Sequence, residues 1–198
     1  TTYYRASKSP LARARLLELI EIETSKVVRK EYPLCTDVHN PDWTPQLEGA
    51  YATVSYGHDL ENIWLVLDAC AAAGVKTQPY QKLFEGLFAN ALKYGYDVEQ
   101  GGFYNSGPFG QPASNRNKVW WVQSEAMVSA LCIHRLTGEQ KYLGVFAKTW
   151  EFVAQSMIDW QHGEWRDTIR PNGSIGGPKA SIWKAGYHNG RAMLECLL

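Results

Sequence analysis

The feature that most constrains the fold of this 198-residue chain is an alternation of two kinds of helix-forming segment. The segment HDLENIWLVLDACAAAG (58–74) is apolar nearly all round, and the amphipathic segment YQKLFEGLFANALKYGYD (80–97) follows it. The same pair recurs as WWVQSEAMVSALCIHRLTG (120–138) and KYLGVFAKTWEFVAQSMID (141–159), and YHNGRAMLECLL (187–198) begins it again. A repeat of roughly 60 residues is the size of a helical hairpin. The sequence therefore predicts a stack or ring of αα-hairpins.

The N-terminal part of the chain adds one more helix and a loop. Ser9 and Pro10 form a capping and first-turn pair, which predicts one long helix over 11–32. The stretch PLCTDVHNPDWTPQ (33–46) is rich in Pro, Asp and Asn, so we expect a loop or a short hairpin there. Together, the predicted helices make up about three and a half helical hairpins.

Composition limits the classes of protein that fit. A hydrophobic content of 45% supplies a well-buried core, and we take residues 1–198 as a single partial domain. The formal net charge of +0 argues against nucleic acid or a membrane surface as a partner. The four cysteines form no C-x-x-C pair, so we expect free thiols in a reducing, cytoplasmic compartment. No apolar run approaches the ~20 residues that would span a bilayer.

The first turns of the three apolar helices break the apolar pattern at the same place. They read SYGHDLEN, KVWWVQSE and KAGYHNGR. If the apolar helices form an inner layer, these turns meet at one rim. The rim then gathers His58, Asp59, Glu61, Trp120, Trp121, Gln123, Glu125, His188, Asn189 and Arg191.

The residue types on this rim favour a carbohydrate site. His58 and Glu61 are three residues apart and Trp121 and Glu125 four, so each pair shares a helix face. Sugar rings stack on tryptophan, while their hydroxyls take hydrogen bonds from charged groups. Taken singly, a histidine at a helix start can be a simple cap, and a glutamate there can simply suit the helix dipole. The recurrence on three helices is what favours a site.

Three motifs on these helices carry a family resemblance. SYGHDLENIWLVLDA, KVWWVQSEAMVSAL and WKAGYHNGRAMLECL resemble segments of the N-acylglucosamine 2-epimerase superfamily, most closely its cellobiose and mannobiose 2-epimerase branch. The resemblance implies an all-α fold, an (α/α)6 barrel in which six helical hairpins form a ring. With about three and a half hairpins, we expect this chain to make up about half of that ring, its second half.

The resemblance also implies a chemistry. His58 and His188 would be the acid/base pair that inverts C2 at the reducing-end aldose of a β-1,4-linked disaccharide, through an enediolate. Asn189 and Arg191 would donate hydrogen bonds to the enediolate oxygens. The expected substrate-binding residues are Glu61, Trp121, Glu125, Trp183, Asn189 and Arg191. This scheme requires no cofactor and no metal.

Other functions remain open from the sequence. An aldose–ketose isomerase of the same superfamily would use the same enediolate. A glycoside hydrolase would use two carboxylates, Asp59 or Glu61 with Glu125, and would leave both histidines without a role. A helical-hairpin scaffold that binds a partner protein is the non-enzymatic alternative. Because half a ring leaves inner helices uncovered, we also expect possible self-association through the exposed edges.

Overall fold

The structure, a computed structural model, describes residues 1–29 and 32–197, and it is mainly helical. In chain order the helices are α1 (Thr2–Ser7), α2 (Pro10–Ile22), α3 (Tyr56–Ala73), α4 (Gln81–Gly95), α5 (Trp120–Thr137), α6 (Gln140–Phe152) and α7 (Tyr187–Glu195). Two π-helical turns (Glu23–Val27 and Val153–Met157) and two 3-10 turns (Gly49–Tyr51 and Gln78–Tyr80) add to them. The strands are short: β1 (Thr53–Ser55), β2 (Ser106–Pro108), β3 (Lys118–Val119), β4 (Thr168–Ile169) and β5 (Ile175–Gly176).

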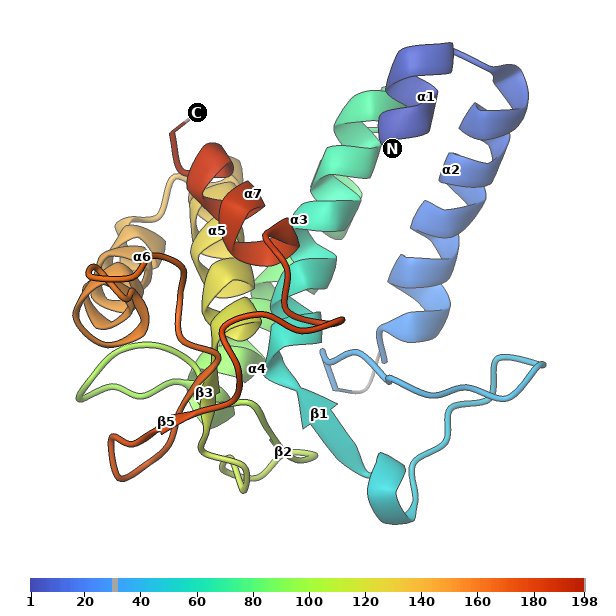
Figure 1. The fold of residues 1–198 in the computed structure, drawn as a ribbon. Coiled ribbons are helices and arrows are strands. Elements are labelled where there is room, and N and C mark those ends of the chain that lie inside the picture. Colours follow the sequence, from blue (N-terminus) through green and yellow to red (C-terminus); the bar gives the residue numbers. More distant parts are fainter. Residues whose placement is uncertain (30–31, 198) are drawn as a thin grey trace.

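The helices form two layers, as the alternating sequence pattern predicted. Helices α3, α5 and α7 lie side by side as an inner layer, with α4 packed on α3 and α6 packed on α5 (Figure 1). Burial follows the same division. Eleven of the 18 residues of α3 and eleven of the 18 residues of α5 are buried, against five of 15 in α4 and three of 13 in α6. The segments that are apolar all round are therefore the inner helices.

The helix predicted over 11–32 is shorter than expected, because helical structure ends at Val27 and its last turn is π-helical. Ser9 does cap it, because its Oγ accepts a hydrogen bond from the Ala12 N–H at 3.4 Å. However, α2 ends at Ile22, and after the π-helical turn Val28 is already extended. Thr24 and Ser25 donate their hydroxyls to main-chain carbonyls of the preceding turn, which competes with regular helix geometry. Residues 30–31 lie outside the described residues.

Three equivalent turns bring the chain back from the outer layer to the inner layer. In each, one residue after an outer helix pairs antiparallel with a residue seven positions later: Val28 with Cys35, Tyr96 with Phe103, and Ile158 with Trp165. We call these the bridged turns. Strands β1 and β2 pair with each other, and β3, β4 and β5 form a second antiparallel sheet. Strands β1 and β3 lead directly into α3 and α5, so the inner helices start at one end of the molecule (Figure 1).

Apolar side chains remain uncovered at both edges of the helical layers. Leu11 and Leu19 of α2 are exposed at one edge, and Leu194 and Leu197 in and after α7 are exposed at the other. None of the described helices is long and apolar enough to cross a membrane. Apolar edges of this kind lower their free energy by covering one another in water.

We expect residues 1–198, expressed alone, to self-associate or aggregate through these two edges. Burying several hundred Å² of apolar surface at ~25 cal/mol per Å² favours association by several kcal/mol before the entropic cost. Light scattering should therefore report a mass above that of the 22.3 kDa monomer. Replacing Leu19 and Leu194 by lysine should reduce the association. Val98→Lys, at an exposed position after α4, should leave it unchanged. A compact monomer at micromolar concentration would contradict the expectation.

Candidate active site

The first turns of α3, α5 and α7 bring two histidines onto the same tryptophan. The imidazole of His58 lies 5.0 Å from the indole of Trp121, centroid to centroid, and the imidazole of His188 lies 5.6 Å from it. The three residues come from three different inner helices. The predicted convergence of these turns is therefore present in the folded chain.

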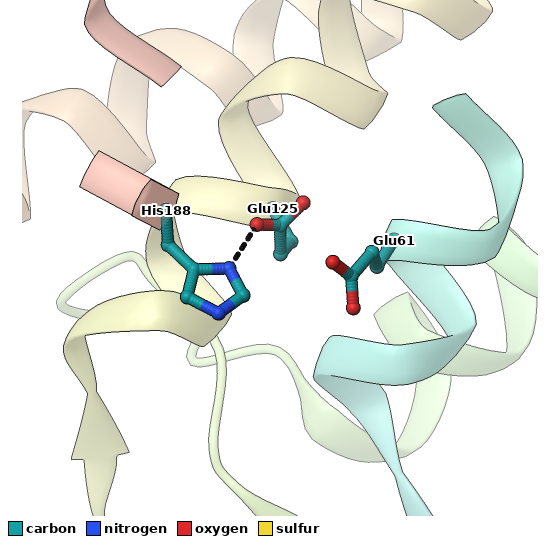
Figure 2. Close-up of side chains that lie close together, drawn as sticks. All are labelled: Glu61, Glu125 and His188. Atoms are coloured by element: carbon teal, nitrogen blue, oxygen red, sulfur yellow. Dashed lines mark hydrogen bonds and ion pairs between the residues drawn. The ribbon is translucent and has the colours of Figure 1, made fainter. Parts of the chain in front are cut away.

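His188 is anchored by a buried carboxylate. Its Nδ1 lies 2.6 Å from Oε1 of Glu125, whose side chain is 0% exposed (Figure 2). The indole Nε1 of Trp64 donates to Oε2 of Glu125 at 2.5 Å, and Nη2 of Arg191 donates to Oε1. A buried carboxylate is costly unless hydrogen bonds and opposite charge compensate it, and here three donors do so. Because an ionised carboxylate only accepts, Nδ1 of His188 carries the proton and Nε2 is the basic nitrogen.

Arg191 has further donors to offer. Its guanidinium carbon lies 4.2 Å from the ring centroid of Trp64 and 4.2 Å from that of Tyr187, so aromatic rings hold the group in place. Its Nε and Nη1 are buried and have no hydrogen-bond partner among the described residues. Buried unpaired donors are unfavourable, and they suit a ligand that brings oxygen acceptors.

His58 has a carboxylate partner of its own. Its Nδ1 lies 3.1 Å from Oδ1 of Asp37, and this hydrogen bond raises the pKa of His58 above its ordinary value. With Nδ1 bound to Asp37, the free nitrogen of the neutral ring is again Nε2. The imidazole is half exposed and lines a cavity of about 570 Å³ together with Asp37 and Glu61. Apolar side chains of α2 and α3 form much of the remaining wall.

Glu61 completes the charged cluster. Burial raises its pKa, and the nearby carboxylate of Glu125 raises it further. Oxygen atoms of Glu61 and Glu125 and a ring nitrogen of His188 lie within 4.8 Å of one another (Figure 2), a spacing that could hold a metal ion. However, Arg191 and His188 already bind Oε1 of Glu125, so positive charge is in place where a divalent ion would need that oxygen. The donor set fits an arginine–histidine pair better than a metal.

Two predicted substrate-binding residues differ from the others in exposure or in hydrogen-bond partner. Trp183, in the loop before α7, has 83% of its surface exposed, so the described structure does not bury it in the site. Asn189 is 6% exposed, and its amide Nδ2 donates to Oε1 of Glu164 at 2.7 Å. That geometry gives Asn189 a structural partner. Substrate contact by Trp183 or Asn189 stays a prediction.

Sequence reasoning missed three residues of the site. Asp37 was part of a segment expected only to be a loop, and no spacing rule connects it with His58. Trp64 was part of a segment described only as apolar nearly all round, yet its N–H binds Glu125. Tyr187 packs edge-on against His188, with ring centroids 4.8 Å apart. A buried tryptophan usually needs a partner for its N–H, and for Trp64 this was the only available signal.

Comparison with known proteins identifies the family. The family model for N-acylglucosamine 2-epimerase matches residues 3–192. A cellobiose 2-epimerase from Bacteroides fragilis is 29% identical over 204 aligned positions, which cover 100% of this chain and 50% of that protein. A D-mannose isomerase from Pseudomonas cannabina is 32% identical over 133 positions, covering 64% of this chain and 31% of that protein.

Solved structures show the same fold. The structure of cellobiose 2-epimerase from Bacillus thermoamylovorans superimposes with a TM-score of 0.88 and 28% identity, over 98% of this chain and 49% of that one. The fold is thus of the (α/α)6-barrel type, as predicted, with about half of the ring in this chain. The chain spans about half the length, or less, of the curated relatives that it matches. The family model extends over almost the whole chain, and the chain therefore belongs to the N-acylglucosamine 2-epimerase family.

Proposed function

We propose that this chain carries the acid/base residues of a sugar 2-epimerase. The observation that supports the proposal most is the pair of histidines that both lie against Trp121, each with a carboxylate at Nδ1. This arrangement leaves Nε2 of His58 and Nε2 of His188 as two bases supplied by different helices. Relatives named as cellobiose and N-acylglucosamine 2-epimerases support the same chemistry.

The proposed reaction inverts the configuration at C2 of an open-chain aldose. One histidine removes the proton from C2, and the electron pair moves toward the aldehyde to give an enediolate. The other histidine, protonated, returns a proton to the opposite face of C2, which regenerates the aldehyde with inverted configuration. A histidine with a pKa near neutrality serves as either acid or base at pH 7. The free donors of Arg191 suit the charge that develops on the enediolate oxygens.

We take the reducing-end glucose or mannose unit of a β-1,4-linked disaccharide as the substrate. The name of the Bacteroides fragilis relative, which aligns with the whole chain, supports this choice. We take the partly exposed ring of Trp121 as the group on which a sugar ring stacks. The free thiols of all four cysteines support a reducing compartment, and we place the protein in the cytoplasm.

An aldose–ketose isomerase is the second candidate. The similarity to a D-mannose isomerase favours it, because the same enediolate gives a ketose when the proton returns to C1. A hydrolase is less well supported. A GH76 α-mannanase shares the fold, with a TM-score of 0.63 at 17% identity. However, Glu125 is fully buried and already bound by three donors, so it is poorly placed to protonate a leaving group.

We expect His188→Ala to abolish epimerisation in a protein that carries the complete ring. Loss of a general acid/base should lower the rate of C2 exchange by ~10²-fold or more. Proton exchange at C2, followed by NMR in D2O, measures it directly. Glu125 keeps Trp64 and Arg191 as partners, so the fold should survive, which circular dichroism can check. His162→Ala, an exposed histidine paired with Asp159, is the matched control and should leave the rate unchanged. Activity within a few-fold of the parent would remove His188 from the mechanism.

Incorporation of deuterium from D2O distinguishes the epimerase, the isomerase and the hydrolase. Incubation of the active protein with cellobiose in D2O should give glucosyl-mannose with deuterium at C2 and no free glucose, because a C–H bond breaks and the glycosidic bond does not. A labelled 2-ketose would favour the isomerase. Free glucose without label at C2 would favour the carboxylate pair of a hydrolase and would refute the epimerase.

A further inference from the structure

The inner helices α3, α5 and α7 share one polar contact near their starts, and in α3 and α7 the residue that makes it directly follows a histidine. In its first turn each carries a buried polar side chain that binds the bridged turn before it. Oδ1 of Asp59 accepts from the N–H of Cys35 at 2.6 Å. The amide of Gln123 accepts from the N–H of Phe103 and donates to its carbonyl, both at 2.7 Å. In α7 the corresponding residue is Asn189, whose amide Nδ2 donates to Glu164 in the last bridged turn.

In the first repeat, the residue that Asp59 binds lies two positions before Asp37, the partner of His58. Cys35, held by Asp59, pairs with Val28, and the N–H of Thr36 donates to the carbonyl of Val27 at 3.0 Å. The next residue is Asp37, whose carboxylate meets His58. Two adjacent residues of α3 therefore bind the same short segment. Asp59 binds its backbone from the buried side, and His58 binds its carboxylate at the cavity.

We propose that Asp59 is a positioning residue for His58, which acts by fixing segment 35–37 so that Asp37 stays against the imidazole. The catalytic meaning of this contact depends on the proposed function, but the contact itself does not. The N–H of Cys35 has Asp59 as its partner, and Asp59 is fully buried. Removing the acceptor would leave that N–H buried and unsatisfied, so the segment would shift to find another partner.

The role assigned to Asp59 is that of an acceptor, not of a charge. Burial raises the pKa of Asp59 to about 8, and a carboxyl oxygen can accept the hydrogen bond from the Cys35 N–H in either protonation state. The groups that face it are Cys35, Asn90, Tyr56 and Asp37. His58 itself faces the carboxylates of Asp37 and Glu61, and the charge of Asp59 raises the pKa of His58 as well. Asparagine at position 59 keeps the carbonyl acceptor, whereas alanine removes it, and the two substitutions therefore separate geometry from charge.

The test is the pKa of His58, measured by NMR on the histidine Cε1–H signals of a protein that carries the complete ring. Asp37→Asn should lower it by about one pH unit, because an adjacent carboxylate favours the imidazolium. Asp59→Ala should lower it by nearly as much, and Asp59→Asn should leave it close to the parent value. Gln123→Ala, which removes the equivalent contact in the next repeat, is the matched control and should leave it unchanged.

The double variant decides between positioning and direct electrostatics. If Asp59 acts through Asp37, Asp59→Ala adds nothing to Asp37→Asn, whereas two independent effects would add. Additive effects would overturn the proposal. So would an equal fall in Gln123→Ala, since that would mean general loosening of the fold.

A measurement on the unaltered chain covers the case in which Asp59→Ala does not fold. The N–H of Cys35 is bound to a buried oxygen of Asp59, so its proton should exchange with D2O slowly, as should the N–H of Phe103, which Gln123 binds. A Cys35 amide proton that exchanges as fast as an exposed, unbonded amide would overturn the proposal.

Kinetics distinguish failure of this proposal from failure of the proposed function. In an active protein with the complete ring, the pH dependence of kcat/KM should show an apparent pKa for His58. Asp59→Ala should shift this pKa to lower pH, and Asp59→Asn should leave it at the parent value. A fall in kcat with this pKa unchanged would mean a merely structural role for Asp59. Absence of epimerase activity in the parent would refute the proposed function alone, because the NMR titration needs no turnover.

Discussion

The buried carboxylate of Glu125 joins the three inner helices. It lies on α5 and is bound by Trp64 from α3 and by His188 and Arg191 from α7. A fully buried charge needs hydrogen-bond donors around it, so the donors from α3 and α7 tie both helices to α5. The same interaction fixes the tautomer of His188. The packing of the inner layer and the chemistry of the site therefore depend on one carboxylate.

The second constraint is the return of the chain from the outer layer to the inner layer. Each bridged turn closes a short loop, and a polar side chain at the start of the next inner helix binds that loop. Buried main-chain groups must be satisfied, and here the helix that follows the loop satisfies them. The arrangement places all three first turns at one end of the molecule. That end is where the histidines, the tryptophan and the arginine gather.

The two histidines occupy different environments. His188 lies mostly buried among Trp120, Trp121 and Tyr187, and its carboxylate partner is inaccessible to water. His58 is half exposed, and its partner Asp37 comes from a loop. Interactions between exposed charges are weakened by solvent, so the contact of His58 depends more on how firmly the loop is held. The cavity between α2 and α3 and the exposed leucines of α2 lie on the same side as this histidine.

The sequence by itself determined the helices, their alternation and the meeting of their first turns. Apolar periodicity and end signals are local properties, as Gly74 and Gly138 show: both adopt the left-handed conformation that ends α3 and α5. The motifs around His58, Trp121 and His188 could likewise be identified from the sequence, because each lies within a few residues of a helix start. Only the tertiary structure decided which groups meet across the chain. The pairs Asp37–His58, Trp64–Glu125 and Asn189–Glu164 join residues 21, 61 and 25 positions apart, and no local period connects such positions. The bridge between Val28 and Cys35, which follows the last helical turn, likewise joins residues that no helical period connects. Helix formation follows from neighbours in sequence, whereas the partners of buried polar groups are chosen when the layers pack.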